Sequence, residues 1–184
     1  MRLFVGLDLP PEVIQALETF QNRLRPLAKL SWSPTANLHV TTKFIGEWPQ
    51  DRVDELNQSL RGLGPREPVT LRVGGLGFYP NARGPRVFWA GIDAPPGLHE
   101  LARQTDQALA ALGVEPESRP FSPHLTLARI RTQVPLNRLA AEIERHGEID
   151  FGQFTADRFF LYLSQRGSGG SVYTKLSEFP FSTP

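Results

Sequence analysis

The 184-residue sequence contains no cysteine. Disulfides, thiolate metal sites and cysteine nucleophiles are therefore excluded as sources of its stability or chemistry. The chain also carries little net charge, +1 at neutral pH, which excludes a strongly basic protein that coats duplex nucleic acid. A local basic site for one phosphate or one strand end is still allowed. No apolar run approaches the ~20 residues of a membrane span and no signal-peptide pattern opens the sequence, so we expect a cytoplasmic protein without membrane contact.

Lysine is scarce as well, because only Lys29, Lys43 and Lys175 among the 20 basic residues are lysine. The others are arginine, whose planar guanidinium makes forked contacts with phosphate and stacks on bases. The apolar share of 40% and the charged share of 21% are typical of a soluble globular protein. The length suits one well-buried domain, or two small lobes that share a core.

A short pattern occurs twice, as His39-Val40-Thr41-Thr42 and as His124-Leu125-Thr126-Leu127. In each copy a histidine and a threonine stand two residues apart within a β-prone run. Because side chains alternate along a strand, this histidine and threonine share one face. Two such strands brought together would place two imidazoles and two hydroxyls around one small anionic group.

The similarity between the two halves extends beyond this motif at a constant offset of 85 positions. A spacing that holds across a strand, a helix and a motif indicates internal duplication. We therefore expect a single domain over residues 1–184, built from two related units that begin near residues 2 and 87. The matching positions are Gly6 and Gly91, Asp8 and Asp93, Pro10-Pro11 and Pro95-Pro96, Leu24 and Leu109, and Leu27 and Leu112.

The hydrophobic periodicity predicts an α+β fold. We expect two lobes related by a pseudo-twofold axis, with two mainly antiparallel sheets facing each other across a central cleft and helices on the outside. One lobe would correspond to each unit. The glycines at 74–77 lack dinucleotide-loop spacing and indicate a strand bend, and 167–170 is a glycine-rich turn. Strands are predicted over 2–8, 30–33, 38–45, 69–78, 86–93, 124–130, 154–164 and 172–179, and helices over 10–27, 51–63, 95–112 and 135–146.

Two histidines can supply the base and the acid of one reaction, because histidine has the side-chain pKa nearest neutrality. Threonine hydroxyls can donate hydrogen bonds to a phosphoryl oxygen. No carboxylate lies within either motif, and two histidines alone make a poor zinc site, so we expect neither a metal nor a cofactor. The pattern favours metal-independent acid–base cleavage of a phosphodiester over two histidines that are merely packed and hydrogen-bonded.

Phe44 and Arg129 each follow a motif histidine by five residues. In a regular strand they would lie on the face opposite the histidine, whereas a bulge could return them to the cleft as a clamp for a nucleobase. Otherwise Phe44 belongs to the core and Arg129 to the surface. Lys43 shares the face of the histidine by parity, and is either a phosphate contact or a surface residue. His99 and His146 have no repeat partner and are assigned to the surface.

These residues resemble the two-histidine phosphoesterases, and among them the 2′-5′ RNA ligase-like RNA 2′,3′-cyclic phosphodiesterases. The resemblance covers essentially the whole chain and rests on segments 1–10, 37–46 and 119–129. It implies hydrolysis of a terminal RNA 2′,3′-cyclic phosphate to a 2′-phosphomonoester, and reversible ATP-independent 2′-5′ joining of RNA ends. It also implies residue roles: His39 as proton donor to the leaving 3′ oxygen, His124 as proton acceptor from water, Thr41 and Thr126 as phosphate contacts, and Phe44 and Arg129 as the brackets of the terminal base.

The expected partner is an RNA end that carries the cyclic phosphate, on a tRNA-like molecule or an oligonucleotide, and the protein is expected to be a monomer. Two alternatives remain at this point. One is a cyclic phosphodiesterase that acts on a small nucleotide. The other is a module that binds nucleotides or RNA ends without catalysis, although binding alone needs neither a base nor an acid.

Overall fold

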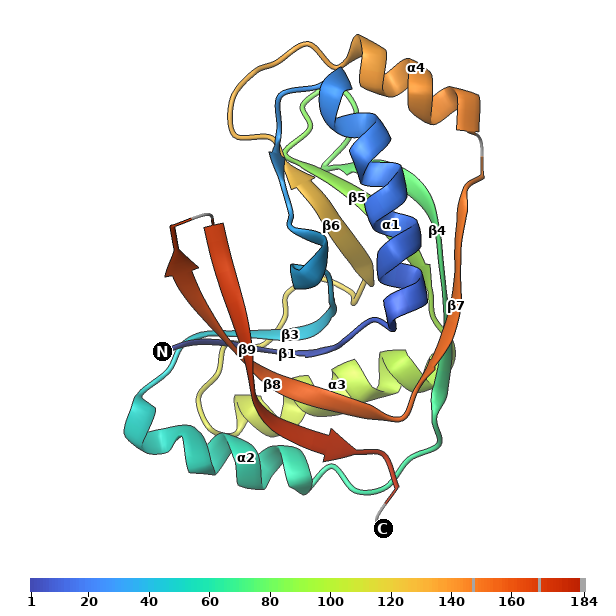
Figure 1. Cartoon of the computed structure of the whole chain (residues 1–184). Helices are drawn as coiled ribbons and strands as arrows, with labels where there is room; N and C mark the ends of the chain where they lie inside the picture. The colour runs from blue at the N-terminus through green and yellow to red at the C-terminus, as the bar shows by residue number, and fades with distance from the viewer. Residues whose placement is uncertain (147, 169, 183–184) are drawn as a thin grey trace.

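Two antiparallel sheets make up the framework of the computed structural model, which describes residues 1–146, 148–168 and 170–182 (Figure 1). Residue 169 of the expected glycine-rich turn lies outside the described residues. Sheet A has the strand order β3 (Val40–Glu47), β1 (Arg2–Leu7), β8 (Arg158–Gly167) and β9 (Gly170–Pro180). Sheet B has the order β2 (Ser31–Trp32), β6 (His124–Arg129), β5 (Val87–Asp93), β4 (Val69–Tyr79) and β7 (Asp150–Ala156).

Four α-helices lie on the outside of the two sheets, as expected. Helices α1 (Pro11–Leu24) and α3 (Pro96–Ala110) each begin with a proline, which the first helical turn tolerates. Helices α2 (Val53–Arg61) and α3 lie together beside sheet A, and α1 runs along sheet B against β7 (Figure 1). Helix α4 (Asn137–His146) lies beyond one end of α1 (Figure 1). The mixed α+β class and the outer helices are therefore confirmed.

One hydrophobic core joins the two sheets. Leu7 of β1, Leu71 of β4 and Leu125 of β6 are fully buried within a single cluster. Helix α1 adds Leu17 and Leu24 to the same cluster, although it follows a strand of sheet A and packs on sheet B. Burial of this apolar surface is the main favourable contribution to folding, and it holds the two sheets together.

The two sequence units do not each form one sheet, contrary to our expectation. Strand β4 of the first unit pairs with β5, and β8 near the C-terminus pairs with β1. The strand predicted over 154–164 is in fact two strands, β7 in sheet B and β8 in sheet A, separated at Asp157. Neither glycine nor proline marks this crossing, so the local pattern could not reveal it.

Both motif strands contain a β-bulge at the same place. In β3 the extra residue is Thr42, because Thr41 pairs with Gly6 and the next pair is Lys43 with Val5. In β6 it is Leu127, 85 positions later, between the pairs of Thr126 with Trp89 and Ala128 with Phe88. A bulge adds one residue to one strand and so reverses the later alternation of side chains. Positions five residues after each histidine consequently return to the histidine face.

The two motif strands, β3 and β6, differ in their register with β1 and β5, the strands with which they pair. Thr41 lies opposite Gly6, but Thr126 lies opposite Trp89 and not opposite Gly91, the residue at the 85-residue offset. The difference of two residues keeps the side chains on the same face but changes their neighbours. The bend predicted at 74–77 is present, since β4 shifts register between Gly74 and Leu76, and Gly75 adopts a φ of 71° that favours glycine.

Candidate active site

A cleft of about 1420 Å³ brings the two motifs together. His39 directly precedes β3 in sheet A, and His124 begins β6 in sheet B, so the fold supplies one motif from each sheet. The two threonines are half-buried and face the same space. The residues of the two motifs that line the cleft are His39, Thr41, Thr42, His124 and Thr126.

Each histidine is held by the backbone two residues before it. The Nδ1 atom of His39 lies 2.7 Å from the carbonyl oxygen of Asn37, and Nδ1 of His124 lies 2.9 Å from that of Ser122. A carbonyl oxygen can only accept a hydrogen bond, so Nδ1 carries the proton in both rings. The Nε2 atom of each neutral imidazole is therefore left as an acceptor, and it becomes a donor when the ring is protonated.

Aromatic side chains surround His39 on the floor of sheet A. The ring of Phe4 stacks on the imidazole with 4.5 Å between centroids, and the edge of Tyr173 approaches at 5.0 Å. This burial lowers the pKa of His39 below 6.5, against the effect of the hydrogen bond to Asn37, and the charges of Arg129 and His124 lower it further.

His124 stands in different surroundings. It is exposed, and among the described residues no aromatic ring contacts it. Sheet A supplies Phe4 of β1 and Tyr173 of β9 to His39, whereas the described residues of sheet B supply no such ring to His124. The sequence did not indicate that these aromatic neighbours of His39 belong to the site. They come from distant strands, and nothing in their local patterns distinguishes them from core residues.

Phe44 and Arg129 both reach the cleft. The two bulges place them on the histidine face, which was one of the two alternatives that the sequence left open. The alternative that Phe44 belongs to the core is wrong, because its side chain is 61% exposed. An exposed ring and an exposed guanidinium on opposite walls form a site suited to a flat ligand.

The parity argument for Lys43 is wrong for the same reason, since the bulge turns this residue away from the histidine face. Its side chain is only 1% exposed, and Nζ lies 2.6 Å from the carbonyl oxygen of Glu115 and 2.6 Å from Oδ1 of Asp106. The Oε1 atom of Glu117 is a third partner at 3.3 Å. With three oxygen partners already bound, this ammonium group is not placed to contact a phosphate.

The other two histidines lie outside the motif pair. His99 is exposed on α3 and contacts the ring of Phe121, and His146 bonds to Glu142 on α4. Within the described residues, no three histidine, cysteine or acidic side chains gather in a way that could hold a metal ion. None of the helices there is both long enough and apolar enough to cross a membrane.

One protein-family model matches the chain twice. The model described as LigT like Phosphoesterase matches residues 7–89 and again residues 92–173. The two matches start 85 positions apart, which is the offset of the histidine motifs. Together they cover most of the chain and include both motifs.

Curated relatives match over nearly the full length. An RNA 2′,3′-cyclic phosphodiesterase of Methanocaldococcus jannaschii is 31% identical over 97% of this chain and 99% of its own. One of Thermus thermophilus is 33% identical over 97% of this chain and 89% of its own. Among solved structures, a Thermus thermophilus protein has a TM-score of 0.81 at 31% identity, with 98% of both chains covered. E. coli LigT complexed with 3′-AMP has a TM-score of 0.77 at 26% identity, covering 99% of this chain and 98% of its own.

Proposed function

Because the chain belongs to the LigT-like phosphoesterase family, we propose that it hydrolyses the 2′,3′-cyclic phosphate at the end of an RNA to a 2′-phosphomonoester. The observation that carries the proposal is the matched pair of histidines. Each has Nδ1 bonded to a backbone carbonyl, and both line one cleft together with a threonine hydroxyl. This is an arrangement for paired proton transfer at an anionic centre.

The reaction follows from the two free Nε2 atoms. His124 accepts a proton from water as the water oxygen forms a bond to phosphorus. The bond from phosphorus to the 3′ oxygen breaks, and protonated His39 donates its Nε2 proton to that oxygen. The hydroxyls of Thr41 and Thr126 donate hydrogen bonds to the non-bridging oxygens, whose negative charge grows in the transition state. The assignment of donor and acceptor rests on the resemblance to the family.

The surroundings of His39 set a condition on its role. In the free protein, burial lowers its pKa and favours the neutral ring, which cannot donate from Nε2. The anionic phosphate between the two rings favours the charged imidazolium. We therefore propose that His39 takes up its proton together with the substrate, while His124 acts as the base.

The neighbours of the two histidines seat the substrate in one direction. We propose that Phe44 stacks on the terminal base and that Arg129 brackets it from the other wall, because both are exposed in the same cleft. With the terminal base held in this way, the 3′ oxygen of the substrate would face His39. Exchanging Phe44 and Arg129 should change the ratio of 2′- to 3′-phosphate among the products. An unchanged product ratio would show that these two residues do not set the orientation.

The decisive experiment measures turnover of an RNA that ends in a 2′,3′-cyclic phosphate, in the presence of a chelator. His39→Ala and His124→Ala should each reduce kcat by at least about 100-fold, the usual contribution of a general acid or base. Circular dichroism and thermal melting should show that both variants remain folded. Full activity in either variant would refute the proposal. Tight binding of a 2′-phosphorylated RNA without turnover by the unmodified protein would identify a binding module instead.

Two further properties belong to the same proposal. By microscopic reversibility, a 5′-hydroxyl in place of water would give ATP-independent 2′-5′ joining of RNA ends by the same two histidines. The protein should also act as a monomer, since one chain supplies both histidines, both threonines and the two bracketing residues. Analytical ultracentrifugation of the active protein tests the second point.

A further inference from the structure

Four arginines of the cleft have no part in the chemistry described above. Arg2 and Arg166 belong to β1 and β8 of sheet A, whereas Arg119 and Arg131 precede and follow β6 of sheet B. All four are exposed. Among the described residues, none of them forms an ion pair with a carboxylate. Both walls of the cleft therefore present free guanidinium groups.

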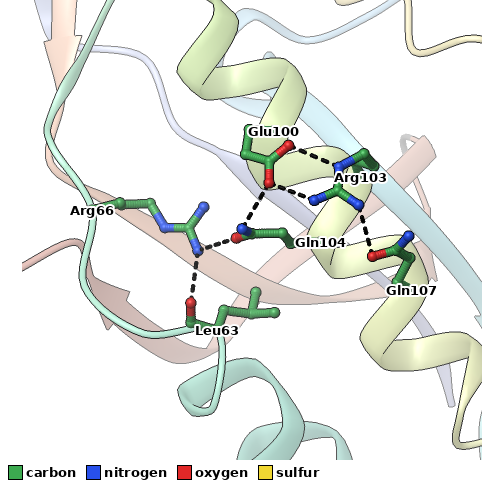
Figure 2. Close-up of polar contacts among 6 residues, drawn as sticks. All are labelled: Leu63, Arg66, Glu100, Arg103, Gln104 and Gln107. Atoms are coloured by element: carbon green, nitrogen blue, oxygen red, sulfur yellow. Dashed lines mark hydrogen bonds and ion pairs between the residues drawn. The ribbon is translucent and has the colours of Figure 1, made fainter.

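Two other basic residues of the cleft, Lys43 and Arg103, differ in this respect. Lys43 is bonded to Asp106 and Glu117. Arg103 on α3 is held by both carboxylate oxygens of Glu100 and by the amide oxygen of Gln107, as Figure 2 shows. Seven lysine and arginine side chains line the cleft against three carboxylates, although the whole chain has a net charge of only +1. The positive charge of the molecule is thus concentrated at this site.

The volume of the cleft also indicates a ligand larger than a small molecule. Sites for small molecules usually enclose ~300–1,000 Å³, and this cleft measures about 1420 Å³. A single cyclic phosphate carries one negative charge, which the two histidines, the threonine hydroxyls and Arg129 can stabilise. Four additional guanidinium groups repel one another unless a polyanion lies between them. A nucleic-acid strand has one phosphate per nucleotide and fits such a distribution.

We infer that the cleft binds a single-stranded RNA end over several nucleotides, and that Arg2, Arg119, Arg131 and Arg166 contact phosphates upstream of the terminal one. The inference rests on the proposed function and adds to it the residues that bind the strand upstream of its end, which a free cyclic mononucleotide would not reach. Arg119 lies over the ring of Tyr79, which is 47% exposed on β4, with 5.8 Å to the ring centroid. This contact holds the guanidinium at the edge of the cleft, and the exposed aromatic ring offers a surface for an upstream base.

The test compares kcat/KM for adenosine 2′,3′-cyclic phosphate with kcat/KM for a single-stranded RNA of about six nucleotides that ends in the same group. The longer substrate should be preferred by about tenfold or more at low salt. Its log(kcat/KM) should fall linearly with log[salt], with a slope of roughly −0.7 for each phosphate contact. Equal values for the two substrates, or equal salt slopes, would overturn the inference.

Two double variants assign the contacts to the two walls. Arg2→Ala with Arg166→Ala tests the wall of sheet A, and Arg119→Ala with Arg131→Ala tests the wall of sheet B. Each pair should reduce the preference for the longer RNA by about threefold or more and make the salt slope shallower by roughly 1.4, the value for two lost contacts. If neither pair changes the preference or the slope, the inference is wrong.

A matched control removes the same charge elsewhere. Arg23→Ala with Arg61→Ala takes two exposed arginines from the last turns of α1 and α2, outside the cleft. If this pair weakens the longer substrate as much as the cleft pairs do, the effect reflects overall charge and the inference fails. Fluorescence anisotropy with an RNA that ends in a 2′-phosphate measures the same contacts without turnover. The inference therefore remains testable even if neither cyclic substrate is hydrolysed and the proposed function fails.

Discussion

At the residue scale, the two histidines are held alike but surrounded differently. The carbonyl contacts through Nδ1 have the same sequence spacing in both motifs. The aromatic packing against Phe4 and Tyr173 belongs to His39 alone. A nearly symmetric scaffold can thus place two imidazoles in different surroundings, and acid–base catalysis by a pair requires such a difference.

The pKa of His39 provides the first prediction at this scale. An NMR titration of the histidine ring signals should place it below 6.5 in the free protein, because burial disfavours the charged ring. Saturation with adenosine 2′-phosphate should raise it, because the anion favours the imidazolium. A pKa that does not rise with the ligand would contradict the donor role of His39.

The same pKa shift links stability to pH. Below a pH of about 6.5 the unfolded chain protonates His39 more readily than the folded chain does. The contribution of His39 to the free energy of unfolding is therefore complete above 6.5, and it is lost as the pH falls through 6.5 toward the lower pKa of the folded state. Urea unfolding of the protein and of His39→Gln between pH 8 and pH 5 should show a steeper loss of stability for the unmodified protein. Parallel curves would refute this linkage.

Thr42 supports another prediction. Its Oγ1 is buried and finds no hydrogen-bond partner among the described residues. The corresponding bulge residue of the other motif is Leu127, an apolar side chain. A buried hydroxyl without a partner costs about 1–3 kcal/mol, so Thr42→Val should raise the free energy of unfolding by about 1 kcal/mol. Chemical denaturation measures this value, and a loss of stability would show that the hydroxyl has a partner.

At the element scale, one lysine ties the strand of the first motif to the segment that leads into the second. Lys43 on β3 binds Glu115, Asp106 and Glu117, and Oδ1 of Asp106 also accepts a hydrogen bond from the backbone N–H of Glu117. The chain then continues through Arg119 and Ser122 to His124. The corresponding residue of the other motif strand is Ala128, so this strand position does not need a charge to fold. These contacts favour a role for Lys43 in positioning the second motif.

Replacement of Lys43 separates stability from activity. Lys43→Met removes a fully buried charge and leaves two partly exposed carboxylates that water can solvate again, so thermal stability should be retained or increased. We expect kcat/KM to fall by about tenfold, because the segment that carries Arg119 and orients His124 loses its tie. Asp106→Asn keeps the buried ammonium but weakens its pairing, and should lower stability by about 1–3 kcal/mol. Unchanged kcat/KM in Lys43→Met would exclude the positioning role.

At the scale of the whole molecule, each of the two sheets is built from strands of both sequence units. Sheet B contains β4 of the first sequence unit, and sheet A contains β8 and β9 from the end of the chain. We propose that the two units arose by duplication within one domain, which the constant 85-residue offset and the paired bulges support. This mixing of strands means that neither unit can complete a sheet alone.

Separation of the two units tests this interdependence. A fragment of residues 1–84 leaves β4 without its neighbours β5 and β7, and residues 85–184 leave β8 without β1. Each fragment alone should therefore lack cooperative thermal unfolding and dispersed NMR signals, whereas a mixture of the two should recover both. Independent folding of either fragment would contradict this account.

The sequence by itself determined the proposed reacting groups and most of the elements. The spacing of His39 and Thr41, and of His124 and Thr126, is a local property, as is the periodicity that predicted the four helices. Only the tertiary structure decided the bulges at Thr42 and Leu127, which bring Phe44 and Arg129 to the histidine face of the cleft and turn Lys43 away from that face. The tertiary structure also decided the sheet crossing at Asp157 and the aromatic surroundings of His39. These features depend on hydrogen bonds and packing between segments far apart in the chain, and no local pattern of residues encodes those contacts.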